Sequence, residues 1–450
     1  MARGATHVLG LDIGSQAIKA VELKLAGGDI RLLGRPLVVP TPEHAVSGGR
    51  IVDTAALSEA LTELITRNGF GTKKVIASVG GDTDVVVRII EVPKMTGKEL
   101  EEAIQWELER QAPFPVDQAV YDYRPIERDD TPADAQNMEI LLAVAQEEMV
   151  DAHVETMMTA KLTPLAIDVE PLAIARALVD AAGDTLADQT LVNVHIGASS
   201  TSILIVRKGL LAFVRSIPTA GSALTSAIRQ NMAESEQQAE QIKRVFADLT
   251  GSYAYEGGGD EGYGASDATS SFDAIGEVED ADSVFEVSDS SQSVDYGSLG
   301  LDEAATQLEI DGASQAYAIP PDQTAPAPPV APAAPAKAPV APEVEAVQAQ
   351  VYEAIAQPLI DLATEVRRSL DFYRRNHRNE DIDRVLLSGG TASIPGLAQF
   401  IGGEIGMNID VANPFEHIIV DEDEADGAYL RDVSPMCVIA VGLAMRDMFS

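Results

Sequence analysis

Two short stretches of this chain have residue types that can hold a phosphate group. Each begins as an apolar run and ends in a turn that contains glycine: residues 8–15 and, far downstream, residues 192–199. Glycine at the tip of such a turn lets backbone N–H groups approach an anion closely, because no Cβ stands in the way. One such turn most often only closes a hairpin, so the indication of a phosphate site comes from the repetition.

The same order of elements follows both stretches. Residues 18–25 and 30–39 in the first half, and residues 201–206 and 210–217 in the second, are apolar runs separated by turn residues. Such runs are typical of adjacent antiparallel strands. A duplicated strand unit predicts two similar domains that face each other across a cleft, with the glycine turns at matching ends of the two sheets.

A third stretch has features of a nucleoside site. Residues 383–397 run from a strand through Gly389 and Gly390 into the start of a helix. The two glycines would let the backbone lie flat against a nucleoside. Thr391 or Ser393 is expected to cap the helix that follows.

Together, these motifs resemble those of the actin-like ATPases, the superfamily that includes sugar kinases, chaperone ATPases and the division protein FtsA. Five motifs match in chain order. The two phosphate motifs are residues 12–15 with Lys19 and residues 196–201, and the adenosine motif is residues 387–391. The two connecting helices are residues 168–173 and 439–444. The resemblance implies an α/β fold in which two duplicated domains surround a nucleotide cleft.

The resemblance also implies a γ-phosphoryl transfer site for ATP and Mg²⁺. Asp12 would hold the hydration shell of the metal, Glu170 would position the attacking water, and Lys19 would reach the phosphate oxygens. The implied phosphate contacts come from both sides, from Gly14, Ser15, Gly197, Ser199 and Thr201. Ribose and base would be contacted by Glu240 and Lys243, and adenosine by Gly389, Gly390 and Thr391. Each of these residues has an ordinary alternative as a turn former or a solvated charge, so the prediction depends on their joint order.

One position departs from the pattern. The second phosphate motif usually carries aspartate where this chain has His195. A neutral imidazole cannot replace a carboxylate in holding hydrated Mg²⁺, and a protonated one would repel the ion. We therefore expect ATP to bind but to be hydrolysed weakly at most, although a lone histidine on a strand is more often structural.

Within the superfamily, the sequence resembles the PilM family of type IV pilus assembly in residues 11–14, 107–115, 240–243 and 368–373. That resemblance implies a cytoplasmic protein held at the inner membrane through its partner. It would bind the short cytoplasmic N-terminal tail of the membrane protein PilN in a groove beside a small inserted subdomain, called 1C. It would also connect to the pilus motor ATPases or platform protein, and self-association is left open.

Two alternatives belong to the same superfamily: an FtsA-like division filament protein and a sugar or acid kinase. The sequence offers no candidate substrate base for a kinase, and a 1C-type subdomain is not a kinase feature. FtsA ends in an amphipathic membrane helix, for which residues 445–450 are too few.

The resemblance and the changes in composition together predict the domain boundaries. The first domain core is expected at residues 1–80 and 166–189, with the 1C-type inset at residues 81–165 between them. The second domain is expected at residues 190–250 and 343–450, with an insert at residues 251–342. The insert is predicted to be disordered, because residues 251–311 are rich in Gly, Ser, Asp and Glu without Lys or Arg, and residues 320–342 form a Pro/Ala tract. It is either an acidic arm for a basic partner or a tolerated loop expansion.

Composition excludes several functions. A formal net charge of −39 over 450 residues argues against binding to nucleic acid or to an anionic membrane by charge. No apolar run approaches the roughly 20 residues of a membrane-spanning helix, and no signal-peptide core follows Met1, so a cytoplasmic protein is expected. Cys437 is the one cysteine and is expected to be a buried thiol.

Three amphipathic helices are expected from apolar residues at helical spacing, around residues 57–65, 100–108 and 224–232. Pro113 is expected to end the second of them. Trp106 and Phe114 in the inset would form either an aromatic surface for a partner peptide or part of the subdomain core.

Overall fold

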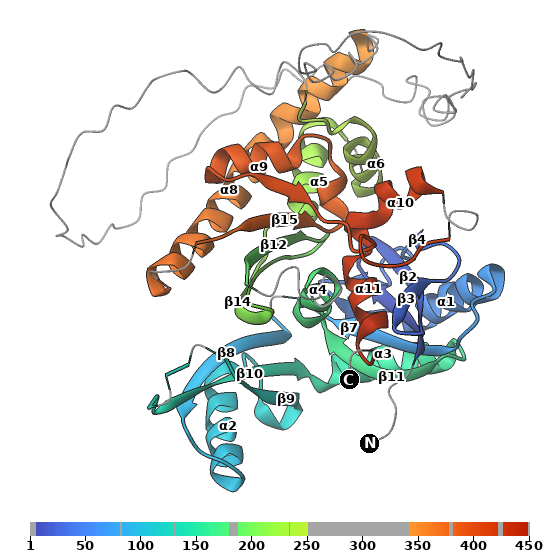
Figure 1. Cartoon of the computed structure of the whole chain (residues 1–450). Helices are drawn as coiled ribbons and strands as arrows, with labels where there is room; N and C mark the ends of the chain where they lie inside the picture. The colour runs from blue at the N-terminus through green and yellow to red at the C-terminus, as the bar shows by residue number, and fades with distance from the viewer. Residues whose placement is uncertain are drawn as a thin grey trace, which may run out of the picture. The chain divides into compact units, whose positions relative to one another are not determined.

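The computed structural model describes residues 6–81, 83–129, 131–132, 134–179, 188–233, 235–250, 342–377, 381–421 and 426–448. These residues form two large sheets, a smaller three-stranded sheet and a two-stranded sheet of β5 (Val46–Ser47) and β6 (Arg50–Ile51), with helices packed against the larger sheets (Figure 1). The α/β class and the duplicated unit predicted from the sequence are confirmed. The insert predicted at residues 251–342 lies outside the described residues except for Pro342.

The first sheet is built from the first predicted strand unit. Its strand order is β11-β7-β1-β2-β3, with β4 also paired to β2: β1 (His7–Ile13), β2 (Ala17–Ala26), β3 (Asp29–Leu32), β4 (Leu37–Pro40), β7 (Lys74–Val79) and β11 (Thr163–Val169). The single run predicted at residues 30–39 is two strands, because Gly34 turns the chain with a φ of 64° and Pro36 has no N–H to donate to a ladder.

The second sheet repeats this plan. Its order is β14-β13-β12-β15-β16: β12 (Thr190–Ile196), β13 (Thr201–Arg207), β14 (Leu210–Ile217), β15 (Arg384–Ser388) and β16 (Ile409–Val411). β12 pairs antiparallel with β13 and parallel with β15, as β1 pairs antiparallel with β2 and parallel with β7. The glycine turns after β1 and β12 are therefore equivalent points of two similar units.

Two helices pack between the sheets and join their cores. α4 (Glu170–Leu178) and α11 (Val438–Met445) share one hydrophobic cluster with strands of both sheets, and every residue of α11 is buried. The approach is so close that a Cβ on Gly442 would lie 1.8 Å from the carbonyl oxygen of Ala173. A Cβ on Gly10 would lie equally close to the carbonyl oxygen of Ala440. These two glycines allow α11 to pack closely against α4 and β1.

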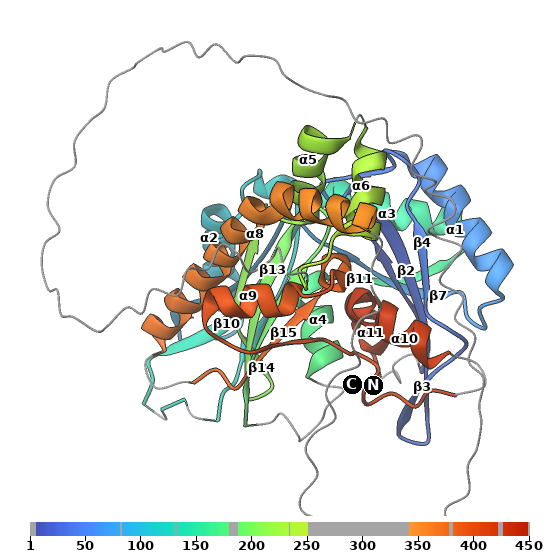
Figure 2. The same ribbon diagram turned by 90° about the horizontal axis from the view of Figure 1, so that it is seen from above.

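The outer helices bury the predicted apolar faces. α1 (Thr54–Asn68) and α3 (Glu147–Thr159) contact each other on the first sheet, and Leu57, Leu61 and Leu64 of α1 are buried. On the second sheet, α8 packs alongside α5 and α6 (Figure 2), and α9 packs on α8: α5 (Gly221–Met232), α6 (Glu236–Phe246), α8 (Pro342–Asn376) and α9 (Leu397–Ile405). α8 continues as one helix through Pro358.

The inset has its own sheet and core. β8 (Val85–Pro93), β10 (Asn137–Gln146) and β9 (Ala119–Ile126) are ordered β8-β10-β9, and α2 (Lys98–Gln111) packs on them. α2 ends just before Pro113, as predicted. Trp106 is 78% exposed whereas Phe114 packs against the inset core, so the expected core role is confirmed for Phe114 and wrong for Trp106. A role of Trp106 in binding a partner peptide stays a prediction.

Cys437 is fully buried, as expected. It follows the short elements α10 (Gly427–Val433) and η6 (Ser434–Met436). Within the described residues no single helix is long and apolar enough to cross a bilayer, and one pair, Gly427–Met436 with Val438–Met445, reaches that composition only across an 85° bend.

Candidate functional site

A cavity of about 440 Å³ lies between the two sheets, at the carboxyl ends of β1 and β12. The predicted site residues that line it come from both halves of the chain: Asp12, Gly14, Ser15, Lys19, Glu170, Gly197, Ser199, Glu240, Lys243, Gly389, Gly390 and Thr391. The fold thus brings together residues separated by up to several hundred positions. Thr201 is the one predicted site residue that does not line the cavity.

The two glycine tips face one another across this cavity. The hydroxyl oxygens of Ser15 and Ser199 are 2.8 Å apart. Both turns have the same internal hydrogen bond: the N–H of Gly14 donates to the carbonyl of Ala17 at 3.1 Å, and the N–H of Gly197 donates to Ser200 at 3.0 Å. An anion between the tips would therefore meet equivalent backbone and hydroxyl groups on both sides.

A cation and a carboxylate stand side by side at the first tip. Asp12 and Lys19 are direct partners across β1 and β2, and Lys19 Nζ lies 3.1 Å from Asp12 Oδ2. Both side chains are largely buried. Because Gly14 has no side chain, the ammonium can bend over the turn, where a Cβ would lie 2.9 Å from Nζ. This arrangement gives one positive charge for phosphate and one carboxylate for a metal's water shell.

Glu170 begins α4 at the base of the cavity. Its carboxyl group occupies the space left by Gly80, where a Cβ would lie 1.9 Å from the carboxyl carbon. Burial raises the pKa of Glu170 to about 7, with a smaller contribution from the charge of Asp12 and an opposing one from Lys19. A carboxyl group that titrates near neutral pH can exchange a proton with a nearby water.

The raised pKa makes a prediction about stability. Between pH 4.5 and 7 the folded protein keeps the Glu170 proton while the unfolded chain has released it, so the free energy of unfolding should fall as pH rises. The expected slope is at most about 1.4 kcal/mol per pH unit. Urea unfolding of the wild type and Glu170→Gln at pH 5 to 8 measures it: the stability difference between the two proteins should change across this range.

The exposed Glu147 at the start of α3 gives the matched control, since Glu147→Gln makes the same substitution where the carboxyl group is solvated. A Glu170→Gln protein whose stability relative to wild type stays constant from pH 5 to 8 would show that this carboxyl group titrates normally.

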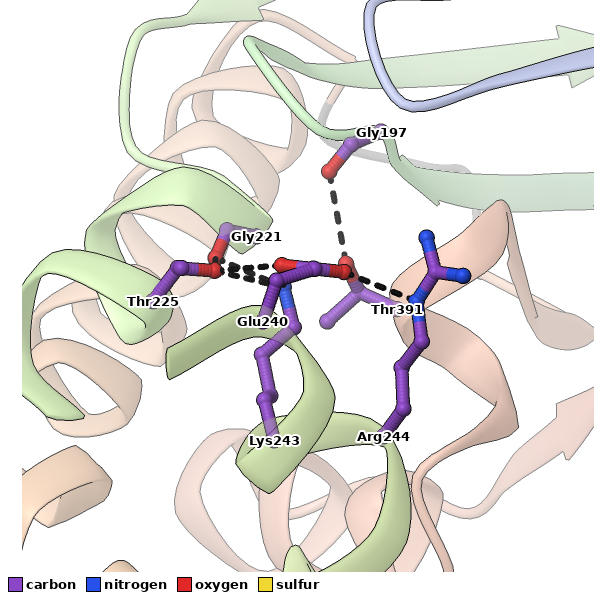
Figure 3. A network of polar contacts seen from close by, with 7 residues as sticks. All are labelled: Gly197, Gly221, Thr225, Glu240, Lys243, Arg244 and Thr391. Atoms are coloured by element: carbon purple, nitrogen blue, oxygen red, sulfur yellow. Dashed lines mark hydrogen bonds and ion pairs between the residues drawn. The ribbon is translucent and has the colours of Figure 1, made fainter. Parts of the chain in front are cut away.

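A second polar cluster lies on the α6 side of the cavity (Figure 3). Glu240 is at its centre: Oε2 lies 2.6 Å from Lys243 Nζ and accepts from Thr225 Oγ1 at 2.7 Å, and Oε1 accepts from Arg244 Nε at 3.1 Å. Lys243 also donates to the carbonyl of Gly221 at 3.1 Å, and burial lowers its pKa. The cluster holds a carboxylate in a fixed position, where it can accept hydrogen bonds from ribose hydroxyl groups.

Two local predictions are wrong. Thr201 is fully buried, and its hydroxyl donates to the carbonyl of Thr219 at 2.8 Å, because its position on β13 points it away from the cavity. Neither Thr391 nor Ser393 caps a helix, since both lie in the short 3₁₀ turn η5 (Gly390–Ser393) and α9 begins only after Gly396, which has a φ of 82°.

His195 lies on β12 and is among the residues that line the cavity. Its Nδ1 is 2.9 Å from the hydroxyl oxygen of Ser388 on the neighbouring strand β15. Burial, together with the positive charge of Lys19, lowers the pKa of His195 to about 3. The imidazole is therefore neutral at physiological pH and does not repel a cation.

The sequence did not identify His153 and Arg244 as cavity residues. His153 is buried on α3, where Nδ1 donates to the carbonyl of Met149 at 2.8 Å and burial lowers its pKa. A single histidine in a helix gives no signal in the sequence. Arg244 did have one, because it is four residues after Glu240 on the same helix.

The donor set can accept a divalent cation only with help from a ligand. In the described part of the chain no group of three or more His, Cys, Asp or Glu side chains could hold a metal. Asp12 offers a carboxylate, and cations that accompany nucleotides are commonly held by one or two carboxylates together with phosphate and water oxygens. The cavity therefore fits a metal–nucleotide complex rather than a metal alone.

Comparisons with known proteins identify similar chains. A family model described as "Type IV pilus assembly protein PilM" matches residues 10–256 and 345–448. A chain of a "PilM-PilN type IV pilus biogenesis complex" has 24% identity and a TM-score of 0.69, with 98% of each chain covered. This similarity shows a shared fold.

Two further solved structures match with low TM-scores. Ethanolamine utilization protein EutJ from Carboxydothermus hydrogenoformans has 13% identity and a TM-score of 0.45, covering 98% of this chain and 92% of that one. ADP-bound MreB5 of Spiroplasma citri has 13% identity and a TM-score of 0.42, covering 100% and 97%.

Proposed function

Because this chain belongs to the PilM family of type IV pilus assembly proteins, we propose that it is a nucleotide-binding scaffold of the pilus assembly complex. In this proposal it is cytoplasmic, binds ATP between its two domains, and holds the short cytoplasmic tail of a PilN-type inner-membrane protein beside the inset. The solved relative, which is in a complex with PilN, supports the choice of partner. The family match does not favour the kinase or the division filament protein.

The main observation that supports nucleotide binding is that the two glycine tips face each other across the cavity. Phosphates would lie between Ser15 and Ser199, with Lys19 beside them and a hydrated Mg²⁺ next to Asp12. Glu240 would accept from the ribose. The cation would offset phosphate charge, and Glu170 would hold a water near the terminal phosphate. These contacts support ATP binding. Weak hydrolysis at most is expected because His195 stands where the second phosphate motif usually has aspartate.

A short path joins this cavity to the root of the inset. Two glycine pairs, at positions 48–49 and 80–81, line the cavity. Arg50 follows the first pair, and its Nε donates to Asp84 Oδ2 at 2.6 Å while Nη2 bonds to Gln146. Asp84 and Gln146 are at the points where the chain enters β8 and leaves β10. A shift of the cavity loops would therefore reach the inset through Arg50.

The inset also contacts the second sheet. Arg88 Nη1 donates to the carbonyl of Val214 at 3.3 Å, and Arg128 Nη2 donates to that of Leu211 at 2.7 Å. Both acceptors are on β14, the edge strand of that sheet. Since the inset contacts both domains, a change in cleft closure would alter its position and hence the proposed peptide groove. Contacts with motor ATPases or a platform protein, and self-association, remain predictions from the family resemblance.

Fluorescence anisotropy with a labelled peptide of the PilN-type cytoplasmic tail tests the proposal. Saturable binding is expected, with an affinity that changes when ATP is added, and a scrambled peptide should not bind. Absence of saturable binding to the native peptide, with and without ATP, would contradict the scaffold function.

Arg50→Gln is expected to weaken the effect of ATP on peptide affinity, because it removes the bidentate contact between the cavity loop and the inset. ATP binding itself should change little. The change in peptide affinity on adding ATP, measured in the same assay, should shrink to less than half in this variant. Arg67→Gln is the control, since Arg67 forms an exposed pair with Glu63 on α1. Equal ATP effects in all three proteins would exclude this path.

A further inference from the structure

Asp12 and His195 occupy equivalent positions in the duplicated units. Each lies two residues before the tip glycine of its strand, Gly14 or Gly197, and each lines the cavity. The cross-strand partners differ: Asp12 faces Lys19, whereas His195 faces Ser202. Opposite the carboxylate, the cavity therefore presents an imidazole that has no lysine paired with it across the strands.

A buried chain of hydrogen bonds fixes the tautomer of this imidazole. The amide nitrogen of Asn193 donates to the carbonyl of Leu386 at 3.4 Å, so its Oδ1 is free to accept, and the Ser388 hydroxyl donates to that oxygen at 3.1 Å. A serine has one proton, so Ser388 Oγ must accept from His195 Nδ1–H at 2.9 Å. All three side chains are at least 93% buried. The lone pair is consequently on Nε2.

Nε2 has no protein partner among the described residues. A core histidine normally uses both nitrogens, because an unpaired buried acceptor costs about 1–3 kcal/mol. Here Nδ1 is bound to Ser388 and His195 is a cavity-lining residue, so Nε2 is the nitrogen left for a ligand. An Nδ1–H oriented by a buried acceptor, with Nε2 open, is the arrangement in which histidine ligates metals.

We propose that His195 Nε2 is an inner-sphere ligand of the cation that accompanies the nucleotide, and that the site consequently prefers a borderline first-row transition cation to Mg²⁺. This proposal rests on nucleotide binding in the cavity. Mg²⁺ prefers oxygen ligands and keeps its waters, whereas imidazole nitrogen suits ions such as Co²⁺ and Zn²⁺. Phosphate and water oxygens would complete the coordination, and Asp12 would accept hydrogen bonds from the bound waters.

Calorimetry with Co²⁺ and Mg²⁺ as probes measures the preference. Wild-type protein is expected to bind ATP roughly tenfold or more tightly with Co²⁺ than with Mg²⁺, and His195→Asp should bring that ratio close to one, because it restores an all-oxygen site. Ser388→Ala should lower the ratio partway, since outer-shell partners of metal ligands typically affect metal affinity by about 10–100-fold. His44→Asp removes an exposed imidazole and should leave the ratio unchanged.

A spectroscopic measurement on the wild type does not depend on any variant. Pulsed electron paramagnetic resonance of the protein with Mn²⁺ and ATP should show coupling of the metal to an imidazole nitrogen. Bound ATP without this coupling, or equal Co²⁺ to Mg²⁺ ratios in wild type and His195→Asp, would overturn the assignment of His195 while nucleotide binding stands. No ATP binding with any cation would instead overturn the nucleotide site itself.

Discussion

Gly390→Leu is expected to reduce ATP affinity about 100-fold, equivalent to about 2.7 kcal/mol, without destabilising the fold. Gly390 lines the cavity, and a Cβ placed on it would meet no atom within 4 Å. Its φ is outside the positive region, so a side chain is compatible with the backbone. The leucine side chain would therefore occupy space that the adenosine needs. Titration calorimetry of ATP into both proteins measures the loss.

Gly403→Leu is the control for this experiment. Gly403 is exposed on α9, and a Cβ there also meets nothing, but it does not line the cavity. This variant should bind ATP as the wild type does, and thermal unfolding should show all three proteins folded. If Gly390→Leu bound ATP normally, the nucleotide could not lie along the double glycine of the third motif.

Gly442→Ala should destabilise the protein by about 3 kcal/mol or more, since overpacking a dense interior typically costs 1–3 kcal/mol and here no side chain can move aside. The new Cβ would lie 1.8 Å from the carbonyl oxygen and 2.5 Å from the carbonyl carbon of Ala173, both backbone atoms. Relief therefore requires α4 and α11 to separate. Because Glu170 begins α4, that separation would also weaken ATP binding. Urea unfolding measures the first effect, and calorimetry the second.

Gly403→Ala makes the same change in an exposed helical position with open space. It is expected to be neutral or stabilising by about 0.5–1 kcal/mol, because alanine loses less backbone entropy than glycine in a helix. Similar unfolding free energies for the two variants would mean that α4 and α11 do not pack as closely as described.

The strands, the helical faces and the duplication could be predicted because they are local patterns. The alternation and length of the apolar runs around β1 and β12, and the spacing of Leu57, Leu61 and Leu64, are determined by which side of an element faces the core. The order of the glycine turns along the chain was then enough to predict a shared cleft. Strand ends were less predictable, since Gly34 splits an apolar run that otherwise reads as one strand.

The polar details of the site were less predictable, because they depend on neighbours distant in sequence. Nothing near His195 in the sequence shows that Ser388, 193 residues later, accepts its Nδ1 proton. Likewise, the pKa of Glu170 depends on the space left by Gly80 and on the burial around it. Thr201 was misassigned because its motif fixes its sequence position but not the side of β13 that it faces.

The central claim is that nucleotide phosphates lie between two tips that face each other. Ser15→Cys with Ser199→Cys tests it directly, since the hydroxyl oxygens are 2.8 Å apart and sulfur atoms at these positions could form a bond. Buried Cys437 stays in place, and each single cysteine variant is a control.

We predict that mild oxidation cross-links the double variant in the absence of nucleotide, and that saturating ATP slows the reaction because phosphates separate the tips. Mass spectrometry of the peptide pair measures the rate. No cross-link, or a rate that ATP leaves unchanged, would contradict a nucleotide site between the two domains.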